Sequence, residues 1–278
     1  MILVKNTVLP YILEMMMKKL AGFLVCLLFL SSVGAPKTTA DDRFYTKNYS
    51  AVIPACSGPE RSVEEMEIRL SLLHVNDLNL ARFVYSVLYN GYAPDIYADN
   101  LMDELKLMYK NDSEDLLENL GMYLNYEYNE EHNYTISDQF IVIRASDYLY
   151  FGGAHGAHYL CFYVIDMAVP EILTLSEIIS VNNYPQLKKL IERELRLWSE
   201  EITGEPLPPE KPLTDGIYFE DDFDVNDFCP DKDGIHFWWN VYDLTAYAFG
   251  PVEIVIGWNE LGGLLDPKGV ALARAFGK

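Results

Sequence analysis

The feature that most constrains the fold is a block of alternating, tyrosine-rich segments in the middle of the chain. Apolar and polar residues alternate over 122–128, and dense runs of β-forming residues follow at 140–151 and 159–165. Tyrosine and β-branched residues at a period of two suit the half-buried faces of a sheet. A polar turn is expected between the first two runs. The middle of the chain is therefore predicted to form mainly antiparallel sheet.

Helical periodicity appears on both sides of this block. A strand-like run at 65–75 leads to Asn76 and Asp77, which can cap a helix that ends at Asn90-Gly91. A second helix is expected over 98–109, broken at Lys110, with another turn or two at 114–120. Beyond the block, the pattern predicts a short helix at 177–179 and a long amphipathic helix over 184–202.

The C-terminal part again has strand character. A hairpin turn is expected at 231–234, a last strand at 252–256 and a closing helical turn at 258–265, whereas residues 41–60 are polar and rich in turn formers. The order of helices, strands, helix and strands indicates an α+β fold, with mainly antiparallel sheets and packed helices. Two sequential subdomains are predicted, 41–168 and 169–267, followed by a tail at 268–278.

The N-terminus has the order of a secretory signal peptide. Lys18 and Lys19 precede an apolar run at 20–30, and small residues follow it. The run is short for a membrane span, and the order of charged, apolar and small residues is typical of a cleaved leader. Residues 1–40 are therefore interpreted as a signal peptide, and the mature protein is expected in the periplasm or outside the cell.

Two details of this leader stay open. Cleavage is expected after Ala40 rather than after Ala35, because Pro36 would follow a cut at Ala35. The methionines at 15–17 offer an alternative start of translation. No cysteine follows the apolar run at a small-residue site, so a lipid anchor is not expected.

Acidity dominates the part that follows the leader. The whole chain has a formal net charge of −21, and the residues after position 40 hold 17 basic and 41 acidic side chains, a net charge of −24. Such a surface repels phosphates and anionic headgroups, so nucleic acids and membrane surfaces are poor partners. A cationic partner would be attracted, most strongly at low salt. The alternative is that the acidity only keeps an exported protein soluble.

Three cysteines follow the leader: Cys56, Cys161 and Cys229. An odd number in an oxidising compartment permits at most one disulfide and one thiol. Cys161 and Cys229 lie in strand-like segments and are the expected pair, the alternative being three buried thiols. No spacing of cysteine and histidine fits a zinc site, so no metal or cofactor is expected.

The most unusual local feature is a glycine-rich loop with a histidine at its tip. Gly152, Gly153 and Gly156 permit positive φ and close backbone approach, which predicts a tight loop between two strands. One interpretation makes this loop a ligand cradle, with His155 as an acid, base or metal ligand and Asp147 nearby. The other makes it a hairpin whose histidine hydrogen-bonds its own backbone.

Two further segments are candidate ligand sites. The acidic residues between 220 and 233 would suit calcium, but their spacing fits no EF-hand loop, so a solvated acidic loop is expected. Trp238 and Trp239 are candidates for an aromatic platform that binds sugar. Strand alternation places one on each face of a sheet, so at least one belongs in the core.

Several of these segments together resemble a known family. The segments 146–155 and 173–179, with 233–237 and 240–256, are similar to extracytoplasmic domains of unknown function. Such domains occur in the RsiV-type anti-sigma factor and ahead of the catalytic domain of PdaC-type polysaccharide deacetylases. The resemblance covers about residues 41–267.

The resemblance implies an α+β module on the outer face of a bacterial membrane, with a PdaC-like first part and an RsiV-like second part. The RsiV-type member senses lysozyme, a cationic protein, by binding it. This chain has neither a membrane helix leading to a sigma-binding segment nor a deacetylase domain, so it is expected neither to signal nor to deacetylate. The resemblance carries over no catalytic residue.

The leading expectation is thus an exported, non-catalytic binding module for cell-wall material, such as peptidoglycan, or for a lysozyme-like cationic protein. The alternative is a secreted hydrolase of cell-wall or other polysaccharide that uses His155 with Asp147 or nearby carboxylates. Ser146, Asp147 and His155 suggest a serine triad only weakly, since no Gly-x-Ser-x-Gly elbow is present.

Overall fold

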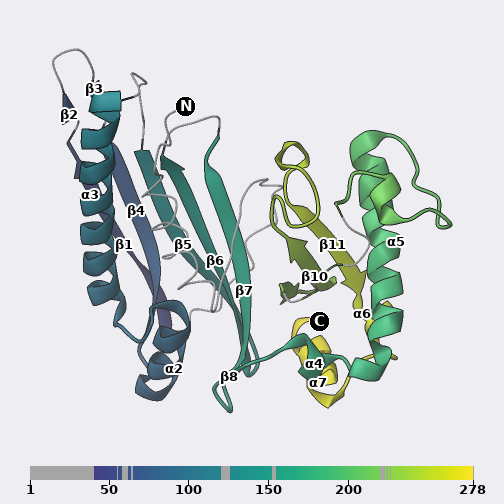
Figure 1. The fold of residues 1–278 in the computed structure, drawn as a ribbon. Helices are drawn as coiled ribbons and strands as arrows, with labels where there is room; N and C mark the ends of the chain where they lie inside the picture. The colour runs from purple at the N-terminus through teal and green to yellow at the C-terminus, as the bar shows by residue number, and fades with distance from the viewer. Residues whose placement is uncertain are drawn as a thin grey trace. The chain divides into compact units, whose positions relative to one another are not determined.

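The computed structural model (Figure 1) describes residues 41–54, 56–57, 62–63, 65–119, 126–151, 155–219, 223, 225 and 227–277. The expected signal peptide lies outside these residues. The chain divides into two compact units, and each is described by itself. Unit 1 holds Arg43–His132 and Ser146–Cys161, and unit 2 holds Asn133–Ala145 and the chain from Phe162 onward.

A six-stranded sheet contributes to both units. Its strands, in spatial order, are β1 (Phe44–Ile53), β4 (Met66–Val75), β5 (Tyr126–Ser137), β6 (Phe140–Phe151), β7 (Ala157–Asp166) and β8 (Glu171–Ile172). β1 pairs with β4 antiparallel along its whole length, and β4 pairs with β5 in parallel. The short strands β2 (Cys56–Ser57) and β3 (Ser62–Val63) form a separate antiparallel pair.

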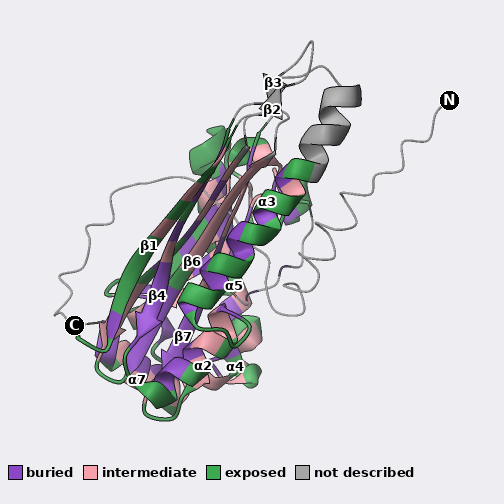
Figure 2. Ribbon diagram, turned by 90° about the vertical axis from the view of Figure 1, so that its left-hand side faces the viewer, coloured by how far each residue is buried: buried purple, intermediate pink, exposed green. Residues whose placement is uncertain are grey.

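Two helices explain the parallel pair in unit 1. α2 (Leu78–Leu88) and α3 (Pro94–Asn119) lie between β4 and β5 in sequence, and parallel neighbours need such a crossover. The Asp77 carboxylate begins α2 by accepting hydrogen bonds from the backbone N–H groups of Asn79 and Leu80, at 3.0 and 2.9 Å. Both helices contact β4, and Figure 2 shows buried residues along α3 and the neighbouring strands. The core of unit 1 includes Met66, Ile68, Leu70, Leu72, Tyr89, Leu101, Leu105 and Tyr128.

Unit 2 packs helices against a three-stranded antiparallel sheet. The sheet runs in the order β11 (Val252–Gly257), β10 (Gly234–Trp239) and β9 (Phe228–Pro230). α5 (Tyr184–Thr203) contacts β11 and buries a stripe of Leu187, Ile191 and Leu195. The remaining elements are α4 (Leu175–Ile178), α6 (Trp258–Leu261), α7 (Pro267–Phe276) and the 3-10 turns η1 (Val181–Asn183), η2 (Leu213–Asp215) and η3 (Tyr247–Phe249).

The α+β class is confirmed, and several local expectations are wrong. The turn-rich start contains the ten-residue strand β1, α3 continues through Lys110, and β5 extends to Ser137 where a polar turn was expected. The expected tail is the helix α7, which buries Leu272 and Phe276 in the core of unit 2. β1 has mostly exposed residues and is a strand through its pairing with β4. β5 buries the polar side chains of Glu130 and His132, which the sequence alone shows only as polar residues.

The units also differ from the predicted sequential subdomains. The chain passes between units within β5, β6 and β7 and not near residue 168. The strands are long enough for their first and second halves to belong to different cores. No helix among the described residues is long and apolar enough to cross a membrane.

Candidate functional site

The candidate site is built on the hairpin turn between β9 and β10. Asp231 Oδ1 accepts hydrogen bonds from the backbone N–H groups of Asp233 and Gly234, at 2.7 and 3.2 Å, which is the ordinary role of aspartate in a turn. Gly234 is required here because a Cβ atom would lie 2.1 Å from the Ile256 carbonyl oxygen. The predicted turn at 231–234 is therefore confirmed, and it fixes the carboxylate of Asp231 over β10.

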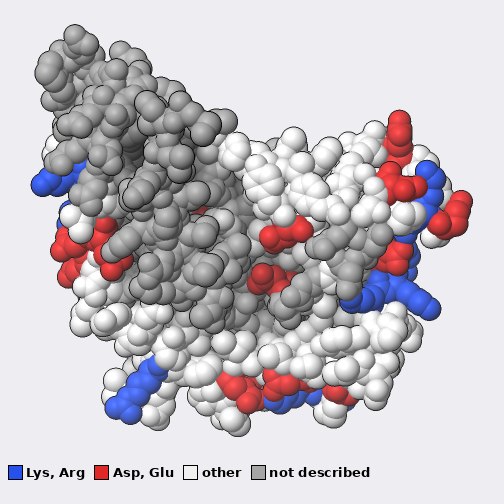
Figure 3. Space-filling view, in the orientation of Figure 1, with Lys and Arg blue, Asp and Glu red and all other residues white. Residues whose placement is uncertain are grey.

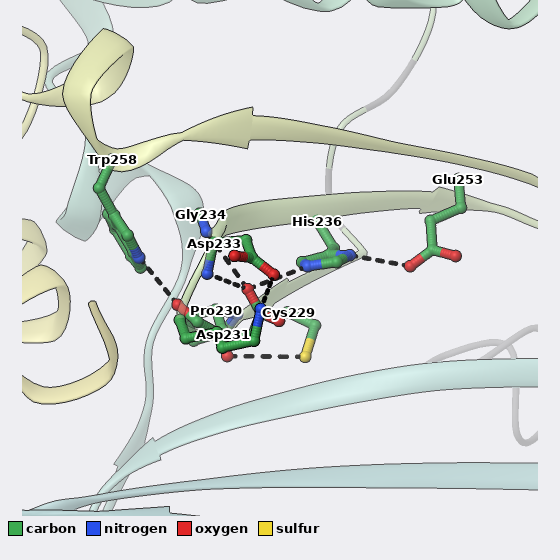
Figure 4. Close-up of polar contacts among 9 residues, drawn as sticks. Cys229, Pro230, Asp231, Asp233, Gly234, His236, Glu253 and Trp258 are labelled. Atoms are coloured by element: carbon green, nitrogen blue, oxygen red, sulfur yellow. Dashed lines mark hydrogen bonds and ion pairs between the residues drawn. The ribbon is translucent and has the colours of Figure 1, made fainter. Parts of the chain in front are cut away.

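His236 lies between two carboxylates on this sheet, as Figure 4 shows. Its Nδ1 is 2.8 Å from Glu253 Oε1 on β11, and its Nε2 is 3.1 Å from Asp231 Oδ1. The contact with Asp231 is an ion pair without hydrogen-bond geometry. Burial alone would lower the pKa of His236, but Glu253 and Asp231 outweigh it and raise that pKa above its ordinary value.

The surroundings of His236 add rigidity and no nucleophile. Trp258 Nε1 donates to the Asp231 carbonyl oxygen at 2.8 Å, so the turn is fixed from its other side. Cys229 pairs with His236 across the β9–β10 ladder. Burial raises the pKa of Cys229 to about 12, and Asp231 and Glu253 add to the effect. A thiol that stays protonated is a poor nucleophile and a poor metal ligand.

The arrangement is best suited to holding a charged imidazole. An imidazolium here has its Nδ1 hydrogen-bonded to Glu253 and its Nε2 in an ion pair with Asp231, so His236 is not poised as a general base. Among the described residues no group of three or more His, Cys, Asp or Glu side chains could hold a metal ion. The site therefore has the chemistry of a proton-binding structural element held between two carboxylates.

The two predicted tryptophans lie on opposite faces of β10. Trp239 is 5% exposed and packs edge-on against Phe223, with ring centroids 5.9 Å apart. Trp238 is half-buried, and its Nε1 donates to Asn240 Oδ1 at 2.8 Å. The prediction that at least one belongs to the core is confirmed, and they do not form a joint platform.

The glycine-rich loop is partly described. Gly152 and Gly153 lie outside the described residues. The exposed His155 has its Nδ1 3.1 Å from the Gly156 carbonyl oxygen, which agrees with the hairpin interpretation. Gly156 packs on Tyr148, where a Cβ atom would come within 2.3 Å of the ring, so close approach explains this glycine. The half-buried Asp147 contributes to a raised pKa of Tyr128, after burial as the main cause.

The expected disulfide is not present. Cys161 and Cys229 are thiols in the structure, and they belong to different units. Most of the acidic run at 220–224 lies outside the described residues. Of the later acidic residues, Asp231 accepts hydrogen bonds within the hairpin turn, and the Asp233 carboxylate pairs with Lys232.

A buried polar network in unit 1 was not found from the sequence. The Glu130 carboxylate is 4% exposed and accepts hydrogen bonds from the hydroxyls of Tyr97 and Tyr128, at 3.0 and 3.1 Å. His132 Nε2 lies 3.3 Å from Glu130, and its Nδ1 is 2.9 Å from the Tyr89 hydroxyl oxygen. The signal in the sequence was the alternation of Tyr128, Glu130 and His132, which places them on one face of β5. The segment was instead interpreted as a polar turn.

One segment in the C-terminal half of the chain matches a known family model. Residues 176–259 match the model of a family described as a protein of unknown function, DUF3298. A DUF3298 domain is therefore present, and it contains β9, β10 and β11 with His236 between its two carboxylates. No curated protein matches the chain.

Two solved structures are similar to the chain. A member of the DUF3298 family from Bacteroides fragilis NCTC 9343 is 22% identical, with a TM-score of 0.66 over 84% of this chain and 97% of that chain. A DUF3298 family protein from Pseudomonas aeruginosa PAO1 is 14% identical, with a TM-score of 0.49 over 81% and 94% of the two chains. The first likeness shows a shared fold.

Proposed function

We propose that this chain is an exported binding module without catalysis of its own, which engages a cationic protein such as lysozyme, or cell-wall material. The signal-peptide pattern supports export to the periplasm or beyond. The resemblance to the RsiV-type and PdaC-type extracytoplasmic domains supports binding as the activity. The presence of a DUF3298 domain is consistent with that resemblance.

The observation that carries the proposal is the surplus of carboxylates in the DUF3298 domain. Residues 176–259 contain 17 acidic and 6 basic side chains. Four of these cations are already in ion pairs within unit 2: Arg193, Arg196, Lys211 and Lys232. In Figure 3, several of the Lys and Arg side chains lie next to Asp and Glu side chains.

Six cations cannot neutralise seventeen carboxylates, so most of the negative charge must be balanced by ions from solution or by a partner. A cationic protein that displaces these ions gains affinity and associates faster, especially at low salt. The raised pKa of His236 removes only one charge from this surplus when the imidazole is protonated. The surplus thus persists across the physiological pH range.

The test is a titration of residues 41–278 with lysozyme, followed by calorimetry at about 20 mM and about 500 mM NaCl, where the Debye length falls from about 20 Å to about 4 Å. We expect binding at low salt that weakens strongly at high salt. Lysozyme with acetylated lysines is the matched control, since acetylation removes charge and leaves the fold. Absence of binding at low salt would contradict the cationic-protein form of the proposal.

Cell-wall material is tested separately by sedimentation with insoluble peptidoglycan. Retention of the protein in the pellet with no affinity for lysozyme would select the cell-wall form. Release of reducing sugar from that material would instead support the rival hydrolase, which requires a catalytic group that turns over substrate.

A further inference from the structure

We propose that the loop between β10 and β11 is the contact surface for the cationic side chains of the partner, and that Tyr242 is its central residue. The proposal rests on the function proposed above and names the residues that carry it. The loop spans 240–251 and contains η3. It is part of the segment 240–256 on which the family resemblance rests, and it contributes no residue to the His236 site described above.

Tyr242 has a backbone conformation that tyrosine rarely adopts. Its φ is +71°, in the left-handed region. The other non-glycine residues with positive φ among the described residues are Asn90 and Asp138, and these types tolerate the left-handed region because their short polar side chains can hydrogen-bond locally. For a bulky side chain the same conformation is strained, and such strain persists where the surroundings or the function require it.

Hydrogen bonds of the loop backbone enforce this conformation. Tyr242 N donates to the Thr245 carbonyl oxygen at 3.1 Å, and Asp243 N donates to the Asn240 carbonyl oxygen at 2.9 Å. The Asp243 carboxylate accepts from Asn240 N at 2.6 Å. Asn240 itself is 3% exposed and accepts from Trp238 Nε1, so the strained turn is anchored in the core of unit 2.

The strain does not serve burial of the ring. Tyr242 is 57% exposed, so folding gains little apolar burial from the side chain that causes the strain. The ring instead lies beside Tyr247, with centroids 5.8 Å apart and planes 36° from parallel. Phe249, on the same short 3-10 turn as Tyr247, is also exposed. The rigid loop thus presents aromatic surface to solvent.

Cations are the best chemical match for this surface. The face of an aromatic ring attracts ammonium and guanidinium groups, and arginine also stacks on it. The carboxylate of Asp243 is adjacent in the chain, and the surrounding domain has a surplus of eleven negative charges. A second copy of residues 41–278 would bring a like charge of −24 to the same surface, which disfavours self-association. A sugar would stack on the ring without using the charge.

The decisive variant is Tyr242→Asn, because asparagine accepts positive φ but lacks the ring. We expect its melting temperature to be equal to or above that of the wild type. The affinity for a labelled hexa-arginine peptide at low salt should fall about tenfold, between the effects of exposed and of desolvated cation–π contacts. Tyr242→Phe should keep the affinity, because it keeps the ring. Tyr92→Asn, which removes a half-exposed tyrosine of unit 1, is the matched control and should also keep it.

The outcomes separate this proposal from the function it rests on. Equal affinity of Tyr242→Asn and the wild type for hexa-arginine overturns the role of Tyr242, even if the wild type binds lysozyme. A large fall in the melting temperature would show that the ring is structural, and it too would overturn the proposal. Loss of chito-oligosaccharide binding in Tyr242→Asn, with hexa-arginine binding unchanged, would assign the loop to sugar. If the wild type binds hexa-arginine through Tyr242 but not lysozyme, the surface stands and the named partner fails.

Discussion

At the scale of single residues, the charge of His236 is controlled by groups from two different elements. Asp231 comes from the hairpin turn and Glu253 from β11, at 3.1 and 2.8 Å from the two ring nitrogens. Lys232 and Asp233 of the same turn form an ion pair with each other. Cys229, across the ladder, remains a neutral thiol because its pKa is raised. The two carboxylates therefore stabilise the imidazolium and raise the pKa of His236 in the folded protein.

This predicts a pH-dependent effect of His236→Gln on stability. The pKa of His236 in the folded protein lies above the unfolded value of about 6.5. The contacts of the imidazolium with its carboxylates therefore stabilise the fold fully below about pH 6.5, and this stabilisation is lost as the pH rises through the folded pKa. We expect the variant to lose about 1–2 kcal/mol of unfolding free energy near pH 6 and much less near pH 9. Urea unfolding at the two pH values measures the difference.

His155→Gln is the control for this measurement, since His155 is exposed and its Nδ1 lies against a backbone carbonyl. It should leave the pH dependence unchanged. A His236→Gln penalty that grows as the pH rises would show that the neutral imidazole is the stabilising form.

The sequence predicts single residues well only where their partners are near in the chain. The Asp231–Gly234 turn and the Asp77 cap were predictable, because each needs residues two or three positions away. Glu253 lies 17 positions from His236, and the register of β10 with β11 decides that they meet. Glu130 and His132 looked like solvated polar residues because Tyr97 and Tyr89, whose hydroxyls contact them, lie 33 and 43 positions away in the chain.

At the scale of elements, a helix or strand was again predicted correctly only where its own segment showed the pattern. α5 and β11 were predicted because their apolar stripes are visible in a single segment. β1 is an edge strand with mostly exposed residues, and its pairing with β4, not its own pattern, makes it a strand. α7 begins with Pro267-Lys268-Gly269, which reads as a loop until its contact with α4 is known.

That contact gives a prediction at Gly269. In a free helix alanine is more favourable than glycine by about 1 kcal/mol. Here a Cβ atom would lie 2.3 Å from the Ile178 carbonyl oxygen and 3.0 Å from Ile178 Cγ2, and backbone cannot yield easily. We therefore expect Gly269→Ala to destabilise unit 2 by about 1–3 kcal/mol, measured by urea unfolding.

Gly263→Ala is the matched control, because nothing lies within 4 Å of the position that its Cβ atom would take. Its effect should stay within about 0.5 kcal/mol. A stabilising Gly269→Ala would mean that helix propensity outweighs the contact, and that α7 can move away from α4.

At the scale of the whole molecule, the net charge of −24 after residue 40 sets how salt acts on stability. Like charges at this density repel and disfavour the compact state. Surface ion pairs such as Lys211–Asp215 oppose this weakly, since exposed pairs contribute about 0–1 kcal/mol each. Added salt should therefore weaken the repulsion between like charges more than it weakens the attraction within surface ion pairs.

We accordingly predict that salt has opposite effects on folding and on partner binding. Raising NaCl from about 20 mM to about 300 mM should increase the melting temperature, while the same change weakens binding of a cationic partner. The triple substitution of the exposed Glu200, Glu201 and Glu205 by glutamine should raise the melting temperature at low salt and reduce its dependence on NaCl. A melting temperature that falls as NaCl is added would mean that ion pairs dominate the electrostatics of folding. In that case the surplus of carboxylates would not dominate the electrostatics of the folded protein, and the main argument for a cationic partner would lose its basis.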